Sequence, residues 1–117
     1  AVACSFCQEF GIDENEMFRI AEGFGLGMGV MEMCGALSGM AMIIGLSNSR
    51  GNTEEGSGSK GDTYKKLRTY IQKFKEKNGS CICRELKGVE TGKVLCSCPQ
   101  CITDAVALTE EYLAENR

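Results

Sequence analysis

The stretch VMEMCGALSGMAMIIGL, residues 30–46, is the most apolar part of the chain and decides the expected fold. Its single charged residue is Glu32, and it contains the spacing Gly35-x-x-x-Gly39. An apolar length with this glycine spacing is also typical of a membrane helix. The glutamate, the glycine-rich residues before it and the lack of basic residues at its front argue against that alternative. They favour a central helix that is buried on all sides of a helical bundle.

Helical patterns precede this segment. Residues 1–10 are mostly apolar and Gly11 is a natural helix stop, so they are expected to form the end of a helix. Asp13 followed by Glu16 resembles a capping box, which predicts the start of a second helix. The glycines that alternate through residues 23–29 predict a turn or an irregular loop, because glycine is costly inside a helix.

Further helices are expected after the apolar segment. Asp62 is expected to cap a helix over Thr63–Asn78, and Gly79 to end it. Residues 81–86 can form a short helical turn, and Pro99 suits the first position of a last helix. Since no strand pattern is persuasive, the sequence predicts an all-α fold, a compact bundle of about five helices with a buried central helix.

The composition limits the possible functions. A chain of 117 residues predicts a single helical, cysteine-rich domain over residues 1–117, and its net charge of −3 offers no basic face for nucleic acid. The absence of histidine excludes Ser-His-Asp and Cys-His catalysis, histidine-containing zinc sites and covalent c-type haem. No secretory signal is recognisable at residues 1–10, so a cytoplasmic location is expected, where abundant cysteines point to catalytic thiols or metal ligands.

The eight cysteines form three groups along the chain: Cys4 and Cys7; Cys34 alone; and Cys81, Cys83, Cys96, Cys98 and Cys101. If the last helix begins at Pro99, Cys98 occupies its N-cap, where free backbone N–H groups stabilise a thiolate. Cys101 then lies one turn further in and can resolve a mixed disulfide. This arrangement predicts thiol–disulfide exchange, and Arg84 would favour the thiolate of Cys83 if their side chains meet.

Two other interpretations of the cysteines stay open. Cys83, Cys96, Cys98 and Cys101 could together hold zinc or an iron–sulfur cluster, although they lack the usual Cys-x-x-Cys spacing on both sides. Alternatively, the protein is a structural or adaptor protein whose cysteines only pack, the interpretation that we favour for Cys4 and Cys7 on their apolar helix.

The residues that directly follow Cys34 are small. Gly35 and Ala36 leave the helix surface beside its sulfur bare, so another part of the chain can approach closely. Pairing with a distant cysteine requires such an approach, and so does a tightly packed helix crossing.

The run from Gly23 to Gly29, followed by Cys34-Gly-Ala-x-x-Gly, resembles the C_GCAxxG_C_C family of redox-active proteins. Cys83, and Cys98 before its proline, resemble the two later cysteine positions of that family. The resemblance implies an α-helical domain with four hallmark cysteines that carry a redox role, three of them Cys34, Cys83 and Cys98.

The resemblance also concerns the start of the chain and the partners. The family's first hallmark cysteine lies in a segment similar to Asn-Cys-x-x-Ala-Val, and Ala1-Val2 matches its end. Its counterpart is therefore expected just before residue 1, or at Cys4 or Cys7. Cys81, Cys96 and Cys101 look like additions. The resemblance further implies a redox partner linked to a transporter.

The leading hypothesis is a thiol redox protein in which Cys34 forms a reversible disulfide with Cys83 or Cys98. Cys98 would attack and Cys101 would resolve. Whether the protein is an enzyme, a thiol–disulfide oxidoreductase, stays open at this point. The hypothesis needs no cofactor, whereas the alternative needs zinc or an iron–sulfur cluster. A homodimer is expected as well.

Overall fold

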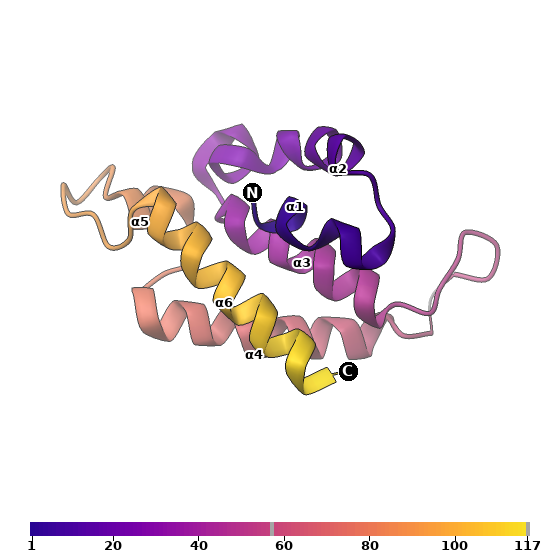
Figure 1. Cartoon of the computed structure of the whole chain (residues 1–117). Helices are drawn as coiled ribbons and strands as arrows, with labels where there is room; N and C mark the ends of the chain where they lie inside the picture. Colours follow the sequence, from indigo (N-terminus) through magenta and orange to yellow (C-terminus); the bar gives the residue numbers. More distant parts are fainter. Residues whose placement is uncertain (57, 117) are drawn as a thin grey trace.

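The computed structural model describes residues 1–56 and 58–116, and helices make up its regular structure (Figure 1). This confirms the all-α prediction. The elements in chain order are α1 (Val2–Phe6), η1 (Cys7–Phe10), α2 (Glu14–Ala21), η2 (Glu22–Phe24), η3 (Gly27–Met31), α3 (Gly35–Asn48), α4 (Lys60–Asn78), α5 (Cys83–Lys87) and α6 (Cys98–Asn116).

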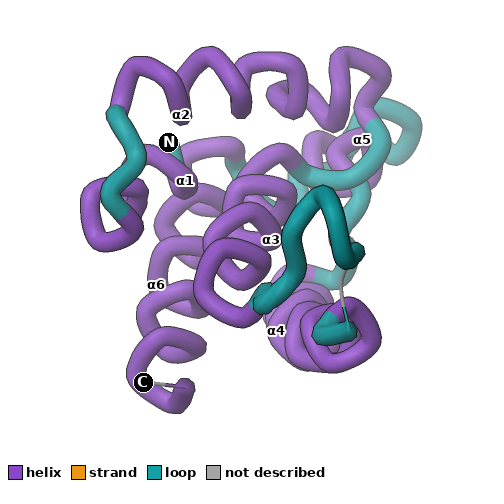
Figure 2. The backbone as a smooth tube through the Cα atoms, turned by 90° about the vertical axis from the view of Figure 1, so that its right-hand side faces the viewer, coloured by secondary structure: helices purple, strands orange, loops and turns teal. Residues whose placement is uncertain are grey.

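Helix α3 is the centre of the fold. It packs against α1, α4 and α6, and the α2–η3 segment runs along the side of α1 and α3 that faces away from α4 (Figures 1 and 2). The side chains of Leu37, Met40, Ile43 and Ile44 on α3 are at most 1% exposed. The predicted central helix is therefore confirmed, with α1, α4 and α6 covering it.

The central helix begins at Gly35, five residues after the start of the apolar stretch. Leu26, Met28 and Met31 before it have left-handed backbone angles, with φ of 52°, 61° and 60°. Such residues cannot belong to a right-handed helix. The glycine-rich segment is thus the irregular connection that the sequence predicts, and Val30 is exposed instead of buried in the central helix.

Two glycines let other segments touch α3 at its backbone. A Cβ atom on Gly35 would lie 2.8 Å from the carbonyl oxygen of Phe24. A Cβ atom on Gly39 would lie 3.2 Å from the backbone nitrogen of Ala3. The small residues around Cys34 therefore do bring distant parts of the chain close, as the sequence suggests.

The helix end and the helix cap that the sequence predicts near the N-terminus are confirmed. Gly11 adopts the left-handed conformation with φ of 69° and ends η1. The Asp13 carboxylate accepts a hydrogen bond of 3.0 Å from the backbone nitrogen of Glu16 and so caps α2.

Two later helices begin earlier than predicted. Helix α4 starts at Lys60, so Asp62 lies in its first turn, where it accepts a hydrogen bond of 3.1 Å from the Asn48 amide. Helix α6 starts at Cys98, because Ser97 takes the N-cap and accepts a hydrogen bond of 3.3 Å from the backbone nitrogen of Gln100. The prediction that Cys98 itself is the N-cap is wrong by one residue, since serine is a strong capping residue.

A buried carboxylate holds the start of α6 against α4. The Asp104 side chain is 4% exposed and accepts hydrogen bonds from Lys77 (2.7 Å), Asn78 (3.2 Å) and Gln100 (2.8 Å). In this way the turn that carries the last cysteines is fixed to the rest of the bundle. Among the residues that the structure describes, no helix has the length and apolar character needed to cross a membrane.

Candidate functional site

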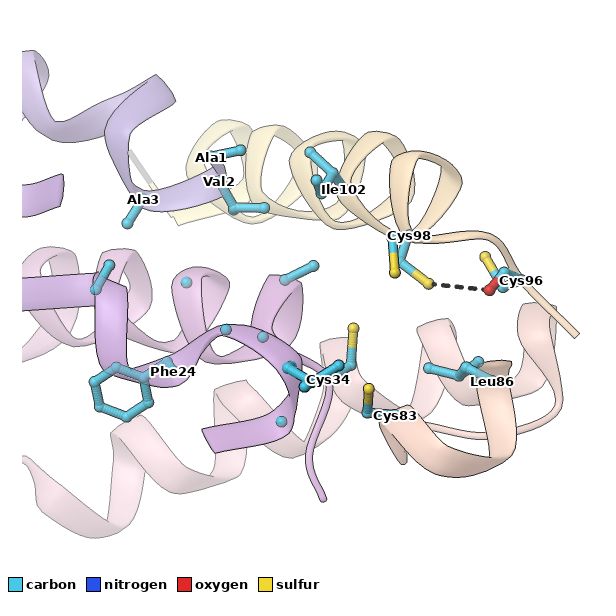
Figure 3. A pocket seen from close by; sticks show the side chains of 18 of the residues that line it. Ala1, Val2, Ala3, Phe24, Cys34, Cys83, Leu86, Cys96, Cys98 and Ile102 are labelled. Carbon is cyan, nitrogen blue, oxygen red and sulfur yellow. Dashed lines mark hydrogen bonds between the residues drawn. The ribbon is translucent and has the colours of Figure 1, made fainter. Parts of the chain in front are cut away.

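One pocket collects most of the cysteines. It has a volume of about 250 Å³ and lies between α1, the glycine-rich segment, α3, α5 and α6 (Figure 3). Its five cysteines are Cys34, Cys83, Cys96, Cys98 and Cys101. The fold therefore brings together the isolated Cys34 and four members of the C-terminal group.

A short backbone pairing places Cys34 beside Cys83. Met33 and Ile82 form an isolated antiparallel bridge. Next to it, the Cys34 nitrogen donates to the carbonyl oxygen of Cys81 at 2.9 Å, and the Cys83 nitrogen donates to the carbonyl oxygen of Glu32 at 2.6 Å. The two cysteines therefore lie on adjoining backbone segments at the pocket, and each is followed by a helix.

A returning loop brings the remaining three cysteines to the same place. Gly88 ends α5 in the left-handed conformation, with φ of 70°. The loop then folds back, and the carbonyl oxygen of Leu86 accepts hydrogen bonds from the nitrogens of Leu95 (3.0 Å) and Cys96 (3.3 Å). This turn positions Cys96 and the start of α6 across the pocket from α5.

The pocket thiols differ in their access to solvent. Cys34, Cys83, Cys96 and Cys101 are each at most 8% exposed, whereas Cys98 is exposed. Figure 3 shows Cys34 and Cys83 on one wall and Cys98 on the wall that faces them. A large reagent can therefore reach Cys98 first.

Burial also affects the protonation of two pocket thiols, Cys83 and Cys101. Burial raises the pKa of Cys83, and the neighbouring Cys34 and Cys98 raise it further. These effects outweigh the positive charges of Lys87 and Arg84, which lower the pKa. Arg84 lowers the pKa of Cys83, as expected, but by less than burial raises it. Its guanidinium also donates to the carbonyl oxygen of Val30 at 3.4 Å.

Cys101 is the most strongly affected thiol of the pocket. Burial raises its pKa far above the usual range, and the neighbouring thiols of Cys96 and Cys34 raise it further. Cys34 and Cys101 both line the pocket and belong to the main buried core cluster. The Cys101 Sγ also donates to the carbonyl oxygen of Cys96 at 3.8 Å (Figure 3).

These raised pKa values predict a loss of stability in alkali. The folded state keeps protons on Cys83 and Cys101 where the same thiols of the unfolded chain, with a pKa of about 8.5, ionise. Their contribution to stability is therefore complete below about pH 8.5 and is lost as the pH rises towards the folded-state values. We expect the midpoint of urea unfolding to fall over this range. In a variant with alanine at both positions that part of the decline should vanish, and an undiminished decline would contradict the effect of burial.

The other three cysteines lie outside the pocket. Cys81 is half-buried against the main core. Cys4 and Cys7 belong to a second cluster that includes Ala3 and Met17, and Cys7 is fully buried with its Sγ donating to the carbonyl oxygen of Cys4 at 3.4 Å. Their positions fit the interpretation of Cys4 and Cys7 as packing residues.

The arrangement of the thiols does not suit a metal ion. Within residues 1–56 and 58–116, no group of three or more cysteine, aspartate or glutamate side chains is placed so that it could hold one. Cys83, Cys96, Cys98 and Cys101 share the pocket wall without forming such a site. The metal-binding alternative gains no support from the geometry.

Sequence reasoning missed one charged residue of the site. Lys87 lines the pocket one helical turn after Cys83 and is the strongest of the charges that counteract the effect of burial on that thiol. Its spacing of four residues from Cys83 was the available signal, but it becomes meaningful only once the two are known to share a helix.

A helical bundle whose thiols meet around one pocket defines a small all-α thiol protein. The chain belongs to the family described as "Putative redox-active protein (C_GCAxxG_C_C)", which matches residues 1–112. This match confirms the resemblance carried by the Cys-Gly-Ala-x-x-Gly motif at Cys34. No curated protein and no solved structure matches the chain.

Proposed function

We propose that this protein exchanges two electrons with disulfides and thiols through a reversible disulfide in the pocket. The observation that carries the proposal is the meeting of Cys34, Cys83, Cys98 and Cys101 around one cavity, from three parts of the sequence. Thiols that only fill a core need no common cavity and no exposed member.

The exposed Cys98 is the entry point. Its thiolate attacks one sulfur of a substrate disulfide, the substrate S–S bond breaks, and the leaving sulfur takes a proton. Cys101 lies three residues further along α6, a separation at which Cα atoms in a helix are close enough for a disulfide. The Cys101 thiol passes its proton to the departing half of the substrate as its Sγ attacks the Cys98 Sγ, so that this half leaves as a thiol. The substrate gains two electrons and two protons, and the protein holds one disulfide.

A second thiol–disulfide exchange, by Cys34, then moves the disulfide to the buried part of the pocket. Because Cys34 lines the same pocket and belongs to the same buried cluster as Cys101, Cys34 can attack the Cys101 Sγ and free Cys98 as a thiol. The product is a Cys34–Cys101 disulfide between α3 and α6. The sequence alone paired Cys34 with Cys83 or Cys98, whereas we favour Cys101 because it is buried with Cys34 in the main core cluster. Cys83 lines the same pocket as Cys34 and Cys98 and provides a further thiol to the same relay.

Peptide mapping tests this proposal. The reduced protein is treated with one equivalent of glutathione disulfide, quenched with acid, alkylated and cut with trypsin. Cleavage after Arg19, Arg50, Lys77, Arg84 and Lys93 places Cys34, Cys83 and the three cysteines of residues 94–117 in different peptides. We expect a cross-link between the peptides 20–50 and 94–117. A Cys81→Ser variant serves as the control and should give the same cross-link.

Absence of the cross-link between the peptides 20–50 and 94–117 would contradict the proposal, even if Cys4 and Cys7 became linked. The cytoplasmic location, the partner linked to a transporter and the homodimer stay predictions beside it.

A further inference from the structure

Apart from its thiols, the pocket has an almost wholly apolar lining. The residues that make this lining come from α1, α2, α3, α5, α6 and the glycine-rich segment, among them Val2, Phe24, Ala36, Met42, Leu86 and Ile102. Lys87 is the one charged side chain among the lining residues that the structure describes. A ligand that fits should therefore have an apolar body and a single negative charge.

We infer that the substrate of the pocket is a small aliphatic disulfide that carries one carboxylate, bound with its carboxylate at Lys87 and its S–S bond at Cys98. The inference rests on the proposed function and adds the class of substrate to it. Lys87 and Cys83 lie on the same short helix, and the ammonium acts on the Cys83 thiol. An aliphatic chain that lies in the pocket then joins the carboxylate at Lys87 to the disulfide at Cys98.

The volume of the cavity also favours a small substrate. A volume of about 250 Å³ corresponds to roughly eight water molecules at about 30 Å³ each. Larger peptide disulfides such as glutathione disulfide carry several charges, and burying them against apolar walls is costly. Such molecules can reach the exposed Cys98, whereas a small apolar disulfide can also occupy the interior.

The reaction with such a substrate is balanced without any other reactant. For a cyclic disulfide, Cys98 attacks one ring sulfur, the ring S–S bond breaks, and the second ring sulfur takes a proton. Cys101 then attacks the Cys98 Sγ, and the first sulfur leaves and takes a proton as well. The ligand becomes a dithiol, the protein becomes a disulfide, and two electrons have moved to the ligand.

The test compares oxidised lipoate with oxidised lipoamide, which has the same ring and chain but no charge. We expect reduced protein to lose thiols about tenfold faster with lipoate, because a partly buried hydrogen bond between ions contributes about 1.5 kcal/mol or more. The same ratio is expected for reduction of the disulfide form by the two dithiols, since forward and reverse reactions share a transition state.

Two matched variants test whether the charge of Lys87 causes the ratio of the two rates. Lys87→Met is expected to bring the two rates together, whereas Lys75→Met, an equal change at an exposed position of α4, should keep the tenfold ratio. Equal rates with the unchanged protein would overturn the inference and leave the proposed function intact, provided that the Cys34 cross-link forms. Loss of that cross-link would overturn the function itself.

Discussion

Replacing Cys98 by serine is expected to slow the first step of disulfide exchange by about 100-fold or more, because a hydroxyl is a far weaker nucleophile than a thiolate. Cys98 is the exposed thiol of the pocket, and the four others are at most 8% exposed. No inner thiol can replace it quickly, since burial raises the pKa of Cys83 and Cys101. The rate is measured by rapid mixing of reduced protein with a disulfide under pseudo-first-order conditions at pH 7.

The control for this experiment is Cys81→Ser, which removes a half-buried thiol outside the pocket. We expect it to exchange at the rate of the unchanged protein. If Cys98→Ser were as fast as Cys81→Ser, entry through the start of α6 would be wrong, and a thiol from the other wall would have to be the attacking group.

Replacing Gly88 by alanine is expected to lower the free energy of unfolding by about 3 kcal/mol. The left-handed backbone at φ of 70° costs about 1–2 kcal/mol for a residue with a Cβ atom. In addition, that Cβ atom would lie 2.2 Å from the carbonyl oxygen of Lys93, so the loop must move at a further cost of about 1–3 kcal/mol. Because this loop carries Cys96 and leads to α6, the change should also separate the two walls of the pocket.

Gly92→Ala gives the matched comparison for urea unfolding. Gly92 has a similar φ of 74°, but no atom lies within 4 Å of its added Cβ position. We expect this variant to lose only the backbone contribution of about 1–2 kcal/mol. Equal losses from the two variants would show that the contact between Gly88 and Lys93 does not hold the loop.

The helical class and its central element follow from local sequence signals. The apolar stretch around Ile43 and Ile44 predicts a buried helix, and Asp13 and Gly11 mark helix ends that the structure keeps. Helix starts were harder to predict, as Ser97 shows. Serine and a following cysteine both suit the start of a helix, and only the observed hydrogen bond to Gln100 decides between them.

The sequence predicts which cysteines gather at the pocket better than it predicts their protonation. The family motif singled out Cys34, Cys83 and Cys98, and the structure places all three at one pocket. The protonation of Cys83 depends on how deeply its sulfur is buried, which no local pattern reveals. For the same reason the influence of Arg84 was overestimated, since its charge is outweighed by burial.

The central claim is that the pocket holds a reversible dithiol–disulfide couple, and a redox titration tests it most directly. The protein is equilibrated in buffers of reduced and oxidised dithiothreitol, quenched with acid, labelled with a thiol reagent and weighed intact. We expect a reversible two-electron transition in which two labels disappear together, at the same midpoint from either direction. Its midpoint should shift in Cys34→Ser, in which the disulfide stays between Cys98 and Cys101. A label count that stays constant across the series, or a transition that Cys34→Ser leaves unchanged, would contradict it.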